Sequence, residues 1–338
     1  MSNRLIGLNL VGLGLLMTLL GIAYWLNTGA RALPRLVEML RTDDVQARVL
    51  AAQSLGHLGL EAKAAVPDLL TLALSNANLN TSAAAAAALP AIDLSAARLV
   101  MAHYLPALQA AEPQTRRDAC AILGGLRALA KPAVPALLIA ARDSDDLVRD
   151  RATRALGNIG IPAGHVIPAL LQSLRDSTPF VRYTAASVFA FGGLSSPESL
   201  TVLTQLANDS DRNVAQLAKS AVAAAERPHQ APTLLPMKPG EGRTYALHHL
   251  AMLGPQAAEA VPTLSSLLTT DQPLDRFLAA TALEAIGPGA EAAVPALAGA
   301  LQDQEPVVRE AAADALRAIG TAQAQAAIEN VQPPENKP

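Results

Sequence analysis

A recurring arginine is the most regular feature of this sequence that could do chemistry. Seven arginines each stand seven residues before an apolar residue, and most successive copies are 33 residues apart. A guanidinium is a planar fork of donors, suited to carboxylates and backbone carbonyls. We therefore expect this arginine column to bond neighbouring repeat units together. Its members are Arg48, Arg116, Arg149, Arg182, Arg243, Arg276 and Arg309.

A column of aspartates offers matching acceptors. Each aspartate stands six residues before the arginine position, where one helix is expected to end and a turn to begin. These side chains recur with the repeat, so we interpret them as structural. The members are Asp143, Asp176, Asp209 and Asp303.

Catalytic and metal-binding patterns are missing from the sequence. Six histidines are scattered over different units without the paired spacing of a helical metal site. Cys120 is the only cysteine, which excludes an internal disulfide, and its place among apolar columns indicates a buried structural thiol. We expect no enzyme activity, metal or cofactor. The histidines are His57, His103, His165, His229, His248 and His249.

The elements that position these columns are pairs of helices. A proline opens the first helix of a unit, and the Ala-rich second helix, which carries the arginine, ends at a glycine in all but one copy, where Arg127 stands. Self-similarity at this period is typical of stacked helical arrays. Counting second helices gives nine, two of which lack the arginine. The prolines are Pro67, Pro135, Pro168, Pro262 and Pro295; the arginine slots without arginine hold Ser82 and Ala215; and Pro90 interrupts the pattern.

The combined proline, aspartate, Val-Arg and Leu-Gly spacing resembles the HEAT-repeat family, in particular the short bacterial form similar to phycobilisome lyases. The resemblance covers Ala32 to about Gly320. It implies an all-α fold, an α-solenoid of about nine HEAT-like helical hairpins. It also implies an arginine–aspartate ladder and second helices that line a concave surface. We expect one elongated interior in which distant units do not touch.

Breaks in the repeat divide the chain into five parts. The prolines between Glu226 and Gly242 forbid a regular helix and predict a surface loop, either a tolerated insertion or a hinge or partner-docking segment. The tail begins like another first helix, from Ala322, and would cover the open end of the core. The parts are an N-terminal anchor or signal segment (1–30), a long arm (31–226), the Pro-rich loop (227–242), a short arm (243–320), and a capping partial helix with a disordered tail (321–338).

The N-terminal segment can cross a membrane. Leu5 to Leu26 is uncharged and nearly all apolar, and about 22 helical residues span roughly 33 Å against about 30 Å of hydrocarbon. Trp25 lies at its distal end, where amphipathic rings prefer the interface. A cleavable signal peptide is the rival, but its apolar region is normally shorter. Flanking arginines conflict over orientation; we expect an extracytoplasmic array, with the cytoplasmic side as the alternative.

Charge argues against nucleic acid as the partner. The formal net charge is -3 and the isoelectric point about 6.1, whereas nucleic-acid binders usually carry a clear basic stripe. A protein partner is therefore expected, bound on exposed positions one, five and nine after each arginine, which share one stripe of the second helix. Packing against neighbouring side chains is the other interpretation of these residues. The candidates are Tyr183 and Phe191, then Phe277, Arg154, Asp150, Arg117 and His248.

These observations favour a membrane-anchored scaffold or adaptor without catalysis. The resemblance to phycobilisome-lyase repeats supplies an alternative, a bilin lyase-like or cofactor-handling protein. A nucleic-acid-binding helical-repeat protein is a further alternative, supported only by a local arginine cluster around Arg117 and Arg154. The oligomeric state and the partner are not encoded in any pattern of the sequence.

Overall fold

The described part of the chain is built from helices. The computed structural model describes residues 29–75, 77–160, 163–192, 196–225 and 241–330, and no residue in these ranges lies in a strand. Helical hairpins follow one another along the chain, which confirms the predicted all-α solenoid. The first helices of the hairpins are α2 (Gly29–Leu40), α4 (Val66–Leu74), α6 (Leu94–Tyr104), α8 (Val134–Ala140), α10 (Ala163–Leu174), α12 (Pro197–Leu206), α15 (Val261–Leu267) and α17 (Val294–Ala300).

The nine predicted second helices are all present. Each unit pairs one of them with a first helix, except that the partner of α14 would fall in residues 226–240, outside the described ranges. The last helix, α19 (Ala322–Glu329), packs on α17 and α18. The second helices are α3 (Val45–Leu58), α5 (Leu79–Ile92), α7 (Pro113–Gly125), α9 (Asp146–Ile159), α11 (Pro179–Gly192), α13 (Arg212–Ala225), α14 (Glu241–Leu253), α16 (Pro273–Ile286) and α18 (Pro306–Ile319).

Short 3-10 turns connect many second helices to the next first helix. Four of the predicted prolines stand at the second residue of α4, α8, α15 and α17, directly after such turns. Pro168 differs, because α10 begins at Ala163 and carries this proline in its interior. Pro90, which interrupts the repeat pattern in the sequence, likewise lies inside a helix, α5, which continues to Ile92. The turns are η1 (Gly59–Ala65), η2 (Pro106–Gln109), η3 (Arg127–Ala133), η4 (Gly254–Ala260) and η5 (Gly287–Ala293).

Close approach of second helices keeps the core thin. A Cβ built on Gly124 of α7 would lie 3.0 Å from the Cα of Ala155 in α9. The buried core is rich in alanine and leucine along its whole length. Successive second helices pack on one another more extensively than successive first helices do. Because the second helices are therefore the more closely spaced layer, they form the inner face of the curved array.

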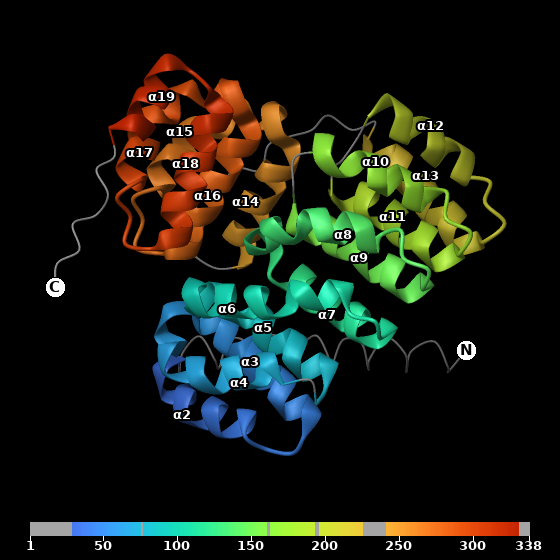
Figure 1. Cartoon of the computed structure of the whole chain (residues 1–338), viewed down its shortest axis with the longest axis horizontal. Helices are drawn as coiled ribbons and strands as arrows, with labels where there is room; N and C mark the ends of the chain where they lie inside the picture. The colour runs from blue at the N-terminus through green and yellow to red at the C-terminus, as the bar shows by residue number, and fades with distance from the viewer. Residues whose placement is uncertain (1–28, 76, 161–162, 193–195, 226–240, 331–338) are drawn as a thin grey trace, which may run out of the picture.

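The array is interrupted between α13 and α14. Each second helix from α3 to α13 packs on the next, and so do α14, α16 and α18, but α13 and α14 form no extensive contact between their described residues. We call α2 to α13 the long arm and α14 to α19 the short arm. Figure 1 shows the short arm, in orange and red, folded back beside α6 and α8 instead of extending the array.

Contacts between the arms contradict the expectation of an elongated array with distant units apart. Arg98 of α6 pairs with Glu310 of α18 at 2.9 Å, and Lys131 of η3 pairs with Glu284 of α16. Only the order of repeats is periodic in the sequence. The long-arm residues of these contacts, Arg98 and Lys131, lie on a first helix and in a 3-10 turn, outside the repeated arginine and aspartate columns, so the repeat period does not indicate the fold-back.

Two sequence predictions fall outside the described residues, namely the anchor or signal segment up to residue 28 and the Pro-rich loop over 226–240. Residues 241 and 242, assigned to that loop, are instead the start of α14. Within the described residues, one stretch is long and apolar enough to span a membrane, Pro273–Ala300. It comprises α16, η5 and α17, and its apolar window is 67% buried, as expected for core helices.

Candidate functional site

Four arginines of the column bond an aspartate in the turn of the following hairpin, 27 residues later. Each guanidinium donates two parallel N–H···O bonds, and the distances from Nε to the carboxylate oxygen are 2.6–2.8 Å. The side chains at both ends are largely buried. The pairs are Arg116–Asp143, Arg149–Asp176, Arg182–Asp209 and Arg276–Asp303.

Each of these guanidiniums also holds the turn of its own hairpin. Nη1 of Arg116 donates to the carbonyl oxygens of Ala110 and Ala111, both at 2.9 Å. Asp143 in turn accepts the backbone N–H of Asp145 at 2.9 Å. The bond from Arg116 holds the pKa of the Asp143 carboxyl below its usual value. We call each arginine–aspartate pair a rung of the ladder. One rung therefore links the turn of its own hairpin to the turn of the next hairpin, which is a structural role.

The ladder changes at its ends and at the break. Arg243, the first arginine of the short arm, bonds Asp275 at 2.8 Å in place of a residue 27 positions later. Arg309, in the last repeat, holds the two carbonyls of its own turn, those of Asp303 and Gln304. Arg48 has Ser75 at the aspartate position, and its buried Nε has no hydrogen-bond partner among the described residues.

Arg117, predicted to contact a partner, is engaged within the array. Its guanidinium bonds both carboxylate oxygens of Asp145, with Nε 2.8 Å from Oδ1, and its side chain is 23% exposed. Asp145 also caps the N-terminus of α9 through the N–H of Val148. The bond from Arg117 lowers the pKa of Asp145 to about 2. Arg117 therefore makes a second rung, and its predicted exposure is corrected.

Among the predicted partner-contact residues, the exposed ones lie on α9 and α11. Tyr183 is 42% exposed, and the Arg154 side chain is 58% exposed. Arg154 donates to the hydroxyl of Thr184 at 3.1 Å, and that hydroxyl donates to Asp150. Asp150 is thus an internal acceptor that positions Arg154 and Thr184. Phe191 lies in α11, but its side chain is outside the described residues.

Two exposed apolar residues complete this surface and were missed by the sequence analysis. Leu147 and Phe180 are each 39% exposed and occupy the same repeat position on α9 and α11. Phe180 lies one turn before Tyr183 on the same helix face. The sequence could have indicated their exposure, because other long-arm units have a polar residue at this repeat position, namely Gln46 and Gln114. We call Leu147, Phe180, Tyr183 and Arg154 the inner-face cluster.

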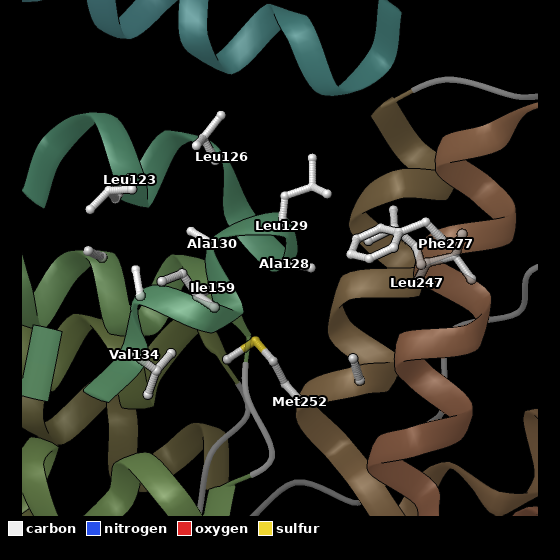
Figure 2. Close-up of a cluster of buried hydrophobic side chains, with 14 of the residues drawn as sticks. Leu123, Leu126, Ala128, Leu129, Ala130, Val134, Ile159, Leu247, Met252 and Phe277 are labelled. Atoms are coloured by element: carbon white, nitrogen blue, oxygen red, sulfur yellow. The ribbon is translucent and has the colours of Figure 1, made fainter. Parts of the chain in front are cut away.

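Phe277 and His248, also predicted to be exposed, are buried. They are only 8% and 7% exposed, because the long arm covers the inner face of the short arm. Burial, assisted by the nearby charge of Arg127, lowers the pKa of His248 to about 4. Figure 2 shows Phe277 and Leu247 on the short arm facing Leu129 and Ala128 of η3 within one apolar cluster. Both residues are therefore corrected to interface residues between the arms.

Sequence comparison identifies the family to which these repeats belong. The family model for HEAT repeats matches residues 101–188 and 234–317, just over half of the chain. The chain belongs to the HEAT-repeat family. The model for the PBS lyase HEAT-like repeat also matches residues 308–332. No curated protein is similar enough to this HEAT-repeat protein to count as a match.

Several solved repeat structures are similar to this HEAT-repeat protein. A designed armadillo repeat protein in complex with the peptide (KR)4 is 17% identical, with a TM-score of 0.39, over 57% of this chain and 99% of that one. Human deoxyhypusine hydroxylase is 25% identical, with a TM-score of 0.31, over 69% and 89%. Kap95p, from a structure with RanGDP, is 15% identical, with a TM-score of 0.44, over 90% and 48%.

The described part of this HEAT-repeat protein shows no candidate metal site. It contains no cluster of three or more histidine, cysteine, aspartate or glutamate residues placed to hold a metal ion. Cys120 is buried in α7, and burial raises the pKa of its thiol to about 12, so the thiolate is scarce near neutral pH. A depression between α10 and α12 is lined by residues that include Arg175, directly after α10, and Glu198 of α12. It does not include the inner-face cluster.

Proposed function

We propose that this HEAT-repeat protein is a scaffold that binds a protein partner on the inner face of its long arm, without catalysis of its own. The observation that carries the proposal is the inner-face cluster, in which two aromatic rings and a leucine are exposed beside an arginine. A chain with 3% aromatic residues exposes few such rings. Aromatic residues and arginine dominate the energetics of protein interfaces.

The chemistry of the cluster supports a partner with an apolar anchor and an acceptor group. Phe180 and Leu147 offer apolar area on adjacent helices, and Tyr183 adds a ring with a hydroxyl. Nη2 of Arg154 donates to the hydroxyl of Thr184, and the other N–H groups of its guanidinium can serve a carboxylate or carbonyl of the partner. The -3 net charge of the chain does not favour nucleic acid.

We also propose that the residues before the array attach it to a membrane. The apolar segment from Leu5 to Leu26 supports this, because its length and lack of charge match a bilayer span. We expect the array on the extracytoplasmic side, since long domains cross largely regardless of flanking charge. Protease added to intact cells would then degrade the array, and protection of the array until lysis would contradict this orientation.

The binding proposal is tested by affinity capture from solubilised membranes. The full chain is compared with a Tyr183→Ala/Phe180→Ala variant, and bound proteins are quantified by mass spectrometry. Tyr245→Ala is the matched control, because Tyr245 is 60% exposed but lies on α14 in the short arm. We expect the double variant to lose a partner by tenfold or more, about 1.4 kcal/mol or more in binding.

Thermal unfolding of both variants completes the test. The double variant should unfold within a few degrees of the parent chain, because the replaced side chains are partly exposed and contribute little packing. A partner that is retained by the double variant and lost in Tyr245→Ala would place binding on the short arm. A collapse of the fold in Tyr183→Ala/Phe180→Ala would show that these rings are core residues.

A further inference from the structure

Where the two arms meet, acidic side chains of the short arm pair with basic side chains of the long arm. Lys131 of η3 lies against Glu284 and is 3.7 Å from Asp314, and Arg98 of α6 contacts Glu310. Glu310 and Asp314 occupy the first and fifth positions after Arg309, the stripe expected to face a partner. The long arm therefore contacts this stripe and buries Phe277 and His248 of the short arm, while the Glu310 and Asp314 side chains stay 59% and 45% exposed.

A glycine of the long arm makes room for a histidine of the short arm. Gly160 ends α9, and a Cβ built on it would lie 2.3 Å from Cε1 of His248. Gly160 also has a left-handed backbone, with φ +67. Beside it, Met252 is 7% exposed, and Figure 2 shows its side chain reaching from α14 towards Val134 and Ile159 of the long arm. The two arms therefore match each other in shape at this contact, as well as in charge.

We infer that the two arms form a clasp, in which η3 and the end of α9 occupy the inner face of the short arm and keep that face from other ligands until the arms separate. The packing of successive second helices is interrupted between α13 and α14, so the stack of helices does not continue from one arm to the other. Among the described residues, no helix or turn of one arm packs extensively on an element of the other. The ion pairs between the arms are partly exposed and open to screening by salt. Such a contact can open without unfolding either arm.

The side chains of η3 show what kind of ligand could compete with it for the inner face of the short arm once the arms separate. This turn presents Leu129, which is flanked in the sequence by Arg127 and Lys131, to Phe277, and Lys131 pairs with Glu284 of the short arm. A competing protein segment would need the same combination of an apolar residue and flanking lysine or arginine. This inference concerns the short arm and does not rest on the proposed function of the inner-face cluster.

Thiol labelling of a Met252→Cys chain measures the opening of the clasp. The full-length protein is treated with a maleimide, and the modification rate at each cysteine is followed by peptide mass spectrometry. Cys120 is an internal control, because it is buried within the long arm and reacts only if the array unfolds. In the Met252→Cys parent we expect slow labelling at both positions, because the closed arms cover position 252.

Gly160→Ala, added to the parent, should open the clasp. The new Cβ would overlap His248, so we expect labelling at position 252 to rise by about tenfold or more while Cys120 stays protected. Gly320→Ala is the matched control. Gly320 has the same left-handed backbone, with φ +70, but a Cβ there meets nothing nearer than 3.7 Å. It should leave labelling at position 252 unchanged.

Charge reversal gives an independent second measurement. Lys131→Glu should accelerate labelling at position 252, and Lys131→Glu/Glu284→Lys should restore slow labelling, because the exchanged pair regains its attraction. Equal labelling rates in the parent, Gly160→Ala and Lys131→Glu would overturn the clasp. So would a parallel rise in labelling of Cys120, because the arms would then be one cooperative body.

Discussion

Arg127 takes a backbone conformation for which the equivalent described residues of other repeats use glycine. Its φ is +53, and it is the one residue other than glycine with positive φ in the described part of the chain. The glycines at this position have φ between +56 and +70. A Cβ in this region collides with backbone, which costs about 1–2 kcal/mol. The repeat pattern identified this residue as an exception, and the structure shows that the turn itself is unchanged.

Arg127→Gly is therefore expected to stabilise the long arm by about 1 kcal/mol, because it relieves the left-handed strain. The measurement is the free energy of unfolding of the full chain in urea. Arg127→Ala separates strain from charge, since it removes the guanidinium but keeps the Cβ. A gain in Arg127→Ala equal to that in Arg127→Gly would attribute the effect to the lost guanidinium.

Helices can stack at this spacing only where small residues face each other. Gly124 of α7 lies against Ala155 of α9, and Gly56 of α3 lies against Ala88 of α5, with distances of 3.0 and 3.2 Å from an added Cβ to the facing Cα. Both glycines stand eight residues after the arginine of their helix. Ala-rich second helices permit close approach, but the sequence alone does not reveal which residues make the contact.

Gly124→Ala and Gly299→Ala should have opposite effects on the free energy of unfolding. Gly299 lies inside α17, and a Cβ added there meets nothing within 4 Å, so alanine should stabilise by about 0.5–1 kcal/mol through helix propensity alone. At Gly124 the same gain is opposed by contact with the backbone of α9, and we expect net destabilisation. Equal stabilisation by both substitutions would show that α7 and α9 can separate at little cost.

The sequence predicts those elements whose contacts recur with the repeat. The second helices and the aspartate partners of Arg116, Arg149, Arg182 and Arg276 all stand at fixed positions in each unit, so their spacing is visible in the chain. Arg117 shows the limit. Its carboxylate partner, Asp145, stands at a helix-capping position that recurs as Asp44 and Asp211, but the repeat does not show that an arginine of the preceding unit bonds it. The exposed face was located correctly at Tyr183 but not at Phe277, which depends on contacts between units far apart in sequence.

The whole molecule departs from a simple solenoid at the clasp. In a simple solenoid each repeat contacts only its neighbours, so the free energy of unfolding is approximately the sum of the stabilities of the repeats and of the interfaces between neighbours. The clasp adds contacts between residues more than 80 positions apart, such as those of Gly160 with His248 and Lys131 with Glu284. Two surfaces therefore differ in availability. The inner-face cluster of the long arm is exposed, whereas Phe277 and His248 on the corresponding face of the short arm are buried.

His248 should make the stability of the closed molecule depend on pH. Its pKa is about 4 in the folded chain, and 6.5 is the ordinary value expected after unfolding. Above pH 6.5 the histidine is neutral in both states. As the pH falls from 6.5 to 4 the unfolded chain takes up the proton first, so folding stability declines, by at most about 3 kcal/mol. Unfolding in urea at a series of pH values measures this slope.

His248→Leu is the control for this pH dependence, because it fills the site without a titratable group. Arg127 and His249 are the charged or titratable neighbours that affect His248, and both remain in the variant. The carboxyls of Asp143 and Asp209 have pKa values below 3.8, so their rungs weaken only at lower pH. The variant should therefore lose the slope between pH 6.5 and 4 and keep the loss at lower pH. An unchanged slope would assign the dependence to groups outside the clasp, since His248 is the buried histidine at the contact between the arms.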